Sequence, residues 1–380
     1  MKNIYLDNSA TTRLDEDVLS CMLPYLKEEY GNASAVYKLG RKARSAIEEA
    51  REKIAKELNC DASEIYFTSG GTESDNTALR GIAHRYSEKG KHIITSKIEH
   101  PAILETCKDL EKEGFTVSYI GVDENGIIDL EELEKAITKD TILISVMFAN
   151  NEIGTIEPIQ KIGEIAKAHS IYFHTDAVQA IGSSRIDVQK LNIDLLSMSS
   201  HKFYGPKGIG ALYVRKGIHF KNVLTGGHQE KNKRPGTENV PAIVGMGRAI
   251  ELAYSNLDEH VNHIKSLRDY LYNEIKSKLP GVIINGDMEN RLPGNLNLSF
   301  KGVRGETLLA NLDMKGIYAS IGSACTSGSL DASHVLLAIG VKEEIAKGSL
   351  RISIGKYNTK EEIDYLIESL VEIITRLRKI

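Results

Sequence analysis

Short apolar runs alternate with helix-like segments between residues 64 and 214, and this alternation constrains the fold of the chain most strongly. Each run is only a few residues long, and the segments between the runs place apolar residues at helical spacing. Strands that alternate with helices in this way are typical of a mostly parallel sheet with helices on both faces. We therefore expect an α/β fold, with strands at 64–68, 92–95, 115–120, 141–148, 171–174, 194–199 and 210–214.

The pattern changes after Pro241, where long helical segments lead to short strands at 282–284, 295–300 and 350–354 and to a final helix. A chain of 380 residues is long for one small core, and a second, smaller domain is a natural expectation. We predict a large α/β domain over residues 13–256. We predict a smaller α+β domain built from residues 1–12 and 257–380.

The overall charge and the cysteine usage exclude several classes of protein. A formal net charge of −4 gives no reason to expect nucleic acid or a membrane surface as a partner. Residues 1–7 lack the apolar segment of a secretory signal, and no apolar run is long enough to cross a bilayer. The four cysteines form no C-x-x-C pair and the histidines no H-E-x-x-H motif, so we expect no metal site and a reduced, cytoplasmic setting.

A glycine-rich segment follows the first strand of the predicted sheet, and open parallel sheets bind ligands at such strand ends. Ser69, Gly70, Gly71 and Thr72 lead directly into a helix. Glycines and hydroxyls at a helix N-terminus offer main-chain N–H groups to a phosphate. The segment matches neither the Walker motif nor G-x-G-x-x-G, so ATP and NAD are not favoured. Simple helix capping by Ser69 or Thr72 is the alternative.

An aspartate and a lysine follow two later strands of the same sheet. Asp176 comes after strand 171–174, and Lys202 comes after strand 194–199. A lysine amine forms Schiff bases with carbonyl groups, most often that of pyridoxal 5'-phosphate (PLP), and a carboxylate can keep the pyridine nitrogen of PLP protonated. Alone, either residue could be an ordinary turn or surface residue. The order of phosphate loop, aspartate and lysine predicts a PLP site.

Four further residues are candidates for the same site. His100 can stack on a pyridine ring and move protons, and Asn151 supplies an amide at the same edge of the sheet. Cys325 lies in the Gly/Ser-rich segment 321–329, which we expect to be an exposed, mobile loop, so its thiol is either a nucleophile or an incidental surface group. Arg351 lies in an apolar strand and needs an anion, either a substrate carboxylate or a structural salt-bridge partner.

Taken in order, these motifs resemble those of the NifS/IscS-type cysteine desulfurases, which are PLP enzymes of fold type I in the class V aminotransferase group. The resemblance runs through nearly the whole chain, from Tyr5 to Arg351. It is carried by residues 5–12 (YLDNSATT), 67–76 (FTSGGTESDN), 150–154 (NNEIG), 201–202 (HK), 234–239 (RPGTEN) and 322–327 (GSACTS).

The resemblance implies a homodimeric enzyme that converts L-cysteine to L-alanine and passes the sulfur to acceptor proteins, for iron–sulfur cluster assembly or for thiolation of tRNA or a cofactor. Lys202 would carry PLP, and Cys325 would receive the sulfur as a persulfide. At the cofactor ring, the resemblance implies Asp176 at the ring nitrogen, Gln179 at the ring hydroxyl and His100 stacked on the ring. The phosphate would be held by Gly71, Thr72, Ser199 and His201, with Thr237 of the other subunit. Asn151 would contact cofactor or substrate, and Arg351 would bind the substrate carboxylate.

Two features depart from the family pattern. Tyr37 stands where relatives usually have a histidine, and the sequence ends at Ile380 without the tail by which housekeeping IscS proteins dock their scaffold, so we expect a NifS-like or specialised role at least as much as the housekeeping one. Selenocysteine lyase, cysteine sulfinate desulfinase and transaminase activities are the nearer alternatives on this fold. A non-catalytic interaction protein of a sulfur-transfer complex is the remote one.

Overall fold

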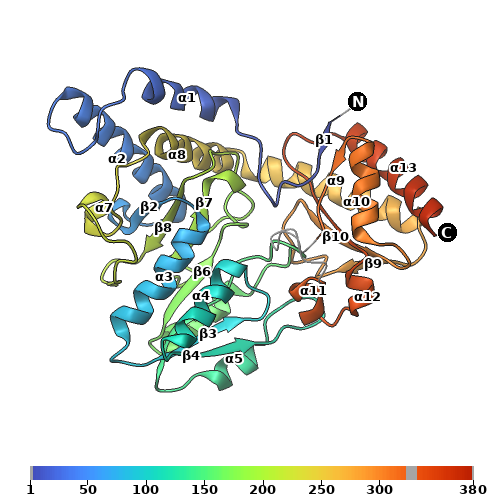
Figure 1. Cartoon of the computed structure of the whole chain (residues 1–380), viewed down its shortest axis with the longest axis horizontal. Helices are drawn as coiled ribbons and strands as arrows, with labels where there is room; N and C mark the ends of the chain where they lie inside the picture. The colour runs from blue at the N-terminus through green and yellow to red at the C-terminus, as the bar shows by residue number, and fades with distance from the viewer. Residues whose placement is uncertain (1–2, 322–331, 379–380) are drawn as a thin grey trace.

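The computed structural model describes residues 3–321 and 332–378 of the chain, and its centre is one sheet of seven strands (Figure 1). The strands lie in the order β2-β8-β7-β6-β5-β3-β4, and only β8 runs against the others. The expected mostly parallel α/β sheet is therefore confirmed. The strands are β2 (Ile65–Thr68), β3 (His92–Ser96), β4 (Thr116–Ile120), β5 (Thr141–Ser145), β6 (Tyr172–Asp176), β7 (Leu195–Ser199) and β8 (Gly210–Val214).

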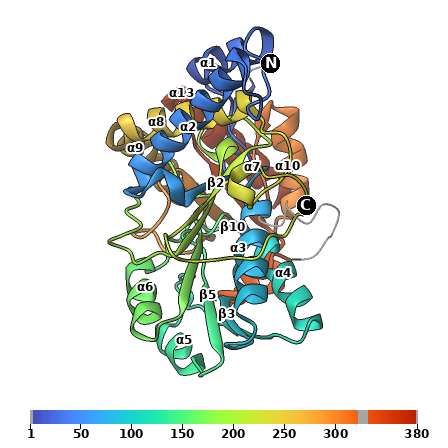
Figure 2. The same cartoon turned by 90° about the vertical axis from the view of Figure 1, so that its left-hand side faces the viewer.

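Successive residues of the strands enter two different hydrophobic cores, because side chains alternate between the faces of a sheet. Ile93 and Leu195 pack with helices α3 (Gly71–Tyr86) and α4 (Pro101–Lys112). Their neighbours Ile94 and Leu196 pack on the other face. That face is covered by α2 (Lys38–Leu58), α5 (Leu130–Ala136), α6 (Ile159–Ala168) and α8 (Val240–Ser255). Figure 2 shows α6 and α3 on opposite sides of the sheet.

A separate core holds the two ends of the chain together, at the right of Figure 1. Ile4 and Leu6, at 1% and 0% exposure, pack there with residues from 267 to 374. The division into domains at residue 256 stays a prediction. The elements are the antiparallel strands β9 (Val282–Asn285), β10 (Asn295–Phe300) and β12 (Ser349–Ser353), the parallel pair β1 (Ile4–Tyr5) and β11 (Ile317–Tyr318), and helices α9 (Leu257–Lys278), α10 (Gly305–Met314) and α13 (Lys360–Leu377).

Some elements differ from the expected ones. Helix α3 begins at Gly71, two residues before the apolar pattern becomes visible, and β5 ends at Ser145 rather than at residue 148. The short elements that the pattern did not indicate are η1 (Ala62–Glu64), η2 (Ser200–Lys202), α7 (Gln229–Asn232), β11, α11 (His334–Ala338) and α12 (Glu343–Ala346). Helix α1 (Glu16–Lys27) is present as expected. Among the helices in residues 3–321 and 332–378, none is long and apolar enough to cross a membrane.

Candidate active site

A cavity of about 260 Å³ opens where the carboxyl ends of the central strands meet the second core. The sheet supplies Asp176 at the end of β6 and Ser199 at the end of β7, and α3 begins beside them. Strand β12 reaches the cavity from the other core through Arg351. The lining residues are Ser9, Ala10, Gly71, Thr72, Asp75, His100, Met147, Asn151, Asp176, Val178, Gln179, Ser199, His201, Lys202 and Arg351.

The N-terminus of α3 forms one end of the cavity. The residue that precedes the helix is Gly70, and no side chain of the described residues caps the helix, so the alternative of capping by Ser69 or Thr72 is wrong. Within that part of the chain, the first N–H groups of this 16-residue helix have no side-chain acceptor and can receive an anion. A Cβ atom at Gly71 would lie 2.7 Å from Val178 Cγ2, so any side chain at this position would crowd the cavity wall.

The motif at residues 234–239 is tied to the same helix. Arg234 Nε donates to Glu73 Oε1 at 2.9 Å, and Glu73 also accepts from the Ser69 main-chain N–H at 2.8 Å. The Arg234 guanidinium lowers the pKa of the Glu73 carboxyl against the effect of burial, which raises it. Thr237, three residues later, is exposed and is not among the residues that line the cavity.

Asp176 and Lys202 both reach the cavity, as the strand ends predicted. Asp176 Oδ1 accepts from the Val178 N–H at 2.9 Å; burial raises the pKa of its carboxyl, while His100 and Lys202 oppose the rise. Lys202 Nζ donates to the main-chain oxygen of Ala10 at 2.9 Å and to that of Ser9. The N-terminal segment thus meets the lysine that the sequence singled out.

Two histidines line opposite parts of the cavity. His100 caps α4, and its Nδ1 accepts from the Ala102 N–H at 3.1 Å. Burial lowers the pKa of His100, and the positive charge of Lys202 lowers it further, while Asp176 opposes both. His201 Nδ1 lies 3.1 Å from Thr11 Oγ1, and burial followed by the charge of Lys202 lowers its pKa to about 4. Both imidazoles are therefore neutral near pH 7.

Arg351 has the structural ion pair, one of the two interactions that the sequence left open. It is 1% exposed, and its Nη2 donates to Asp7 Oδ1 at 2.8 Å while its Nη1 donates to the Asn151 main-chain oxygen at 3.1 Å. Its Nε is buried without a hydrogen-bond partner within the described ranges. Arg351 therefore has a structural ion pair and also lines the cavity, where a carboxylate could reach it.

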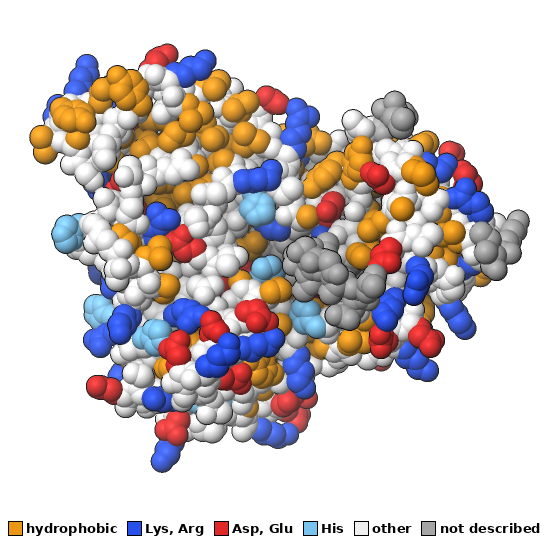
Figure 3. All heavy atoms as spheres, in the orientation of Figure 1, with side chains coloured by type: hydrophobic (Ala, Val, Ile, Leu, Met, Phe, Trp, Pro, Cys, Tyr) orange, Lys and Arg blue, Asp and Glu red, His pale blue; other side chains and the backbone are white. Residues whose placement is uncertain are grey.

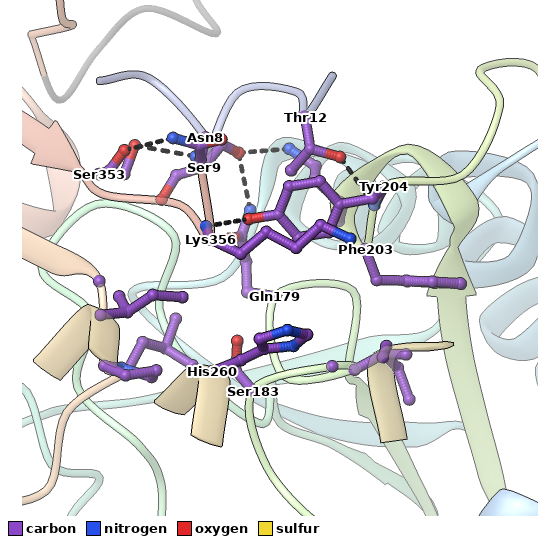
Figure 4. A pocket seen from close by; sticks show the side chains of 18 of the residues that line it. Asn8, Ser9, Thr12, Gln179, Ser183, Phe203, Tyr204, His260, Ser353 and Lys356 are labelled. Carbon is purple, nitrogen blue, oxygen red and sulfur yellow. Dashed lines mark hydrogen bonds between the residues drawn. The ribbon is translucent and has the colours of Figure 1, made fainter. Parts of the chain in front are cut away.

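A second, more enclosed cavity of about 80 Å³ lies next to the first (Figure 4). Ser9, Gln179 and Lys202 line both cavities. Gln179 Nε2 donates to the Ser9 main-chain oxygen at 3.0 Å. On the far side, the Lys356 N–H donates to the Tyr204 hydroxyl at 2.7 Å. The wall between the two cavities is thus a hydrogen-bonded contact between the N-terminal segment and the sheet.

Most of the predicted site residues meet at this one cavity; Thr237 does not, and the structure does not place Cys325. Thr237 lies elsewhere on the surface of the subunit, and Cys325 with its predicted mobile loop lies outside the described residues. Sequence reasoning missed Asp75, although it lies within the same motif as Gly71 and Thr72. The available signal was its spacing: three residues after Thr72 places it on the same helix face.

These features fit a phosphate-bearing pyridine aldehyde such as PLP. An uncapped helix N-terminus can take the phosphate, a buried carboxylate can pair with a ring nitrogen, and a lysine amine lines the same cavity. Two buried polar atoms of the lining residues, Asp75 Oδ1 and Arg351 Nε, also lack a hydrogen-bond partner among the described residues. The cavity thus has the donors and acceptors of a cofactor site that also holds a substrate anion.

Known proteins share this fold over almost the whole chain. The model of the aminotransferase class-V family matches residues 4–366. The cysteine desulfurase IscS of Clostridium botulinum (strain Hall) is 56% identical over 380 residues, which is 100% of this chain and 96% of that protein. A solved NifS-like protein has a TM-score of 0.94 at 43% identity, covering 99% of this chain and 100% of that one. A solved complex of SspA with cysteine has a TM-score of 0.83 at 38% identity, over 94% and 100% of the two chains.

The fold and the cavity define a class V aminotransferase type of protein, a group whose enzymes depend on PLP. The chain belongs to the aminotransferase class-V family and, within it, to the cysteine desulfurases of the IscS and NifS type. The family, the fold class and the enzyme class that the motifs implied are therefore confirmed.

Proposed function

We propose that this chain uses PLP to convert L-cysteine to L-alanine and to leave the sulfur as a persulfide on Cys325. The observation that supports the proposal most is the meeting of four groups at one cavity: a buried carboxylate, a lysine, a neutral imidazole and a buried guanidinium. These groups are Asp176, Lys202, His100 and Arg351. Each matches one requirement of amino-acid chemistry on PLP.

Four lining residues would hold the cofactor phosphate. Gly71 and Thr72 offer the N–H groups and positive dipole of the α3 N-terminus, while Ser199 and His201 add a hydroxyl and an imidazole from the end of β7 and the turn after it. Bound PLP supplies an electron sink for the bonds around the substrate Cα. Asp176 would hold a proton at the ring nitrogen, and Gln179 would donate to the ring hydroxyl.

Proton movement would belong to Lys202 and His100. The lysine amine would hold the cofactor and would take the proton from the substrate Cα. His100 is neutral because burial and Lys202 lower its pKa, so it can stack on the ring and accept a proton. Both residues line the same cavity, which keeps these transfers away from bulk water.

Arg351 would bind the carboxylate of L-cysteine, with Asn151 beside it. The Cys325 thiolate attacks the substrate sulfur. A sulfur–sulfur bond forms, the Cβ–S bond of the substrate breaks, and its electron pair passes to the carbon skeleton. The skeleton takes up protons and leaves as L-alanine, so L-cysteine and the Cys325 thiol are converted to L-alanine and the Cys325 persulfide without an external oxidant.

The assembly and the destination of the sulfur are part of the proposal. We propose a cytoplasmic homodimer in which Thr237 reaches the cofactor phosphate of the other subunit. Its exposed position away from the cavity of its own subunit supports this arrangement. The persulfide would be passed to an acceptor protein, for iron–sulfur cluster assembly or for thiolation of tRNA or a cofactor, with no direct contact to nucleic acid or membrane.

Two variants test the roles of lysine and cysteine together. Cys325→Ala is expected to keep the visible absorbance of the PLP-loaded protein but to form no protein persulfide. Its rate of alanine production should fall at least about 100-fold, because the covalent step on the thiol is lost. Lys202→Ala is expected to lose both the absorbance and the activity. Absorbance spectra, alanine assays and persulfide labelling measure these outcomes. Alanine production at the wild-type rate by Cys325→Ala would exclude the proposed sulfur transfer.

A further inference from the structure

A second carboxylate lies beside Asp176 in the floor of the cofactor cavity. Asp75 is on α3, three residues after Thr72, is 1% exposed and lines the cavity. Its Oδ1 has no hydrogen-bond partner in the part of the chain that the structure describes. A buried, ionised carboxylate is unfavourable when one of its oxygens lacks a partner, so the protonation state of Asp75 needs an explanation.

The nearest basic group to Asp75 is a histidine that cannot supply a positive charge. His174 Nε2 lies 3.7 Å from Asp75 Oδ1. The same ring makes two hydroxyl contacts, with Ser197 Oγ and Ser145 Oγ, each at 2.9 Å. Complete burial lowers the pKa of His174 to about 3. His174 is therefore neutral at physiological pH, and no ion pair forms with Asp75.

The charged groups around the two aspartates are arranged unequally. Asp176 faces His100 and Lys202, which both favour its ionised form. Asp75 instead faces Asp176 and Glu99, which both disfavour its ionised form, and only the Ser197 hydroxyl opposes them. Burial is the largest influence on both carboxyls, and the pKa of Asp75 is raised well above its usual value. Of the two, Asp75 is the one that keeps a proton.

We propose that Asp75 is a positioning residue that holds one proton next to Asp176 and so keeps this buried pair at a single negative charge, located on Asp176. The inference rests on the proposed function, in which Asp176 pairs with the ring nitrogen of PLP. A second negative charge in the same floor would repel the first across a low-dielectric space. With Asp75 neutral, the whole charge of the pair faces the place where the ring nitrogen would lie.

The first residues of α3 would serve two different parts of the cofactor, its phosphate and its ring. Gly71 and Thr72 present the helix N-terminus to an anion, and the positive end of the helix dipole would favour an ionised carboxylate nearby. Asp75 lies one turn further on, in the cavity floor, where burial and Asp176 raise the pKa of its carboxyl. One helix would thus serve both the phosphate and the ring of the cofactor.

The test compares Asp75→Asn with Asp75→Leu in the PLP-loaded protein. Asparagine keeps the shape and the neutral charge of a protonated aspartate, whereas leucine keeps only the approximate volume. We expect Asp75→Asn to hold PLP within about threefold of the wild-type dissociation constant and to keep the pH dependence of the visible absorbance. We expect Asp75→Leu to weaken PLP binding at least tenfold. In infrared difference spectra at pH 7, Asp75→Asn should lose one band of a protonated carboxyl group.

A matched variant separates this inference from the function on which it rests. Asp176→Asn removes the ionised member of the pair and should weaken PLP binding at least tenfold and shift the pH dependence of the absorbance. If Asp176→Asn has no effect, the proposed cofactor site itself is wrong. If Asp176→Asn has this effect but Asp75→Asn also weakens PLP tenfold, or loses no protonated carboxyl band, Asp75 is ionised and the inference is overturned. The infrared result decides the matter even if Asp75→Leu does not fold.

Discussion

Arg351 brings a full positive charge into strand β12, and its partners come from distant parts of the chain. Asp7 lies near the N-terminus, and Asn151 lies six residues after the end of β5. Because Asp7 and the Asn151 main chain each hold one terminal nitrogen, the guanidinium has a defined orientation before a substrate arrives. Such orientation lowers the entropic cost of binding a carboxylate. We therefore expect Asp7 to act on the substrate through Arg351.

Substitution of Asp7 tests this role at the residue scale. Asp7→Asn is expected to raise KM for L-cysteine about tenfold, equivalent to about 1.4 kcal/mol, with a smaller change in kcat, because the guanidinium loses its anionic anchor. Steady-state alanine production measures both constants. Asp194→Asn is the control, since it removes a partly buried partner of Arg215 at the opposite end of the sheet. An unchanged KM in Asp7→Asn, or an equal rise in the control, would contradict the role of Asp7.

At the scale of elements, α7 is tied to the sheet and to α2 by one buried carboxylate. Glu230 accepts from Arg51 Nη2 at 2.7 Å, from Arg51 Nη1 at 2.9 Å and from the Phe67 main-chain N–H at 2.8 Å. The two side chains are 3% and 4% exposed, so the pair is almost free of solvent screening. Figure 1 shows α7 beside β2 and α2. This link positions the segment that leads to Arg234 and Thr237.

Breaking this pair should destabilise the protein strongly. Glu230→Gln keeps the shape of the side chain but removes the buried anion, so the Arg51 guanidinium keeps only the half-exposed Glu48 carboxylate, at 3.1 Å from its Nε. We expect the free energy of unfolding to fall by about 3 kcal/mol, the usual cost of breaking a buried ion pair. Chemical denaturation measures it. Glu16→Gln, in the exposed pair with Arg13, should cost under about 1 kcal/mol; a similar loss in both variants would show that burial is not the cause.

At the scale of the whole molecule, an apolar patch lies on the outer side of α1 and the segment after it. The only buried residue of α1 is Val18, while Leu26 is 57% exposed. Figure 3 shows hydrophobic side chains gathered at the upper left of the molecule, where Figure 1 places α1. A contiguous exposed apolar patch is typical of a protein–protein interface. The exposed apolar residues are Leu19, Leu23, Leu26, Tyr30, Val36 and Tyr37, the last of which replaces the family's histidine.

The patch predicts a homodimer whose subunits complete each other's cofactor sites. Leu23→Glu combined with Leu26→Glu should convert a dimer to a monomer, because two charges would be buried in the interface. PLP affinity should fall at least tenfold, since Thr237 would no longer reach the phosphate of the other subunit. Light scattering and PLP titration measure these effects. Leu337→Glu, an exposed leucine on α11, is the control and should remain dimeric.

A dimer that persists in the double variant would place the interface elsewhere. A monomer that keeps the wild-type PLP affinity would instead remove Thr237 from the cofactor site. The two results therefore test the location of the interface and the role of Thr237 separately.

The strands of the central sheet could be predicted from the sequence because most are short runs of residues buried on both faces of a covered sheet. The edge strand β4, in which only Ile120 is buried, is the exception. The order of these strands in space could not be predicted, since β8 lies between β2 and β7 although it is the last of the seven strands along the chain. The elements that the pattern missed are short. The two-residue strand β11 has no periodicity of its own and exists only because it pairs with β1.

The sequence by itself determined the family, the fold class and most of the residues at the site, because PLP chemistry requires particular side chains in a particular order along the chain. Only the tertiary structure decided which partners those residues have. Asp7, which lies 344 positions from Arg351, is its ion-pair partner. Asp75 looked like an ordinary acidic residue near a helix N-terminus, and only the packing of α3 against β6 buries it beside Asp176. Burial and neighbouring charge set a carboxyl's pKa, and both are properties of the folded chain.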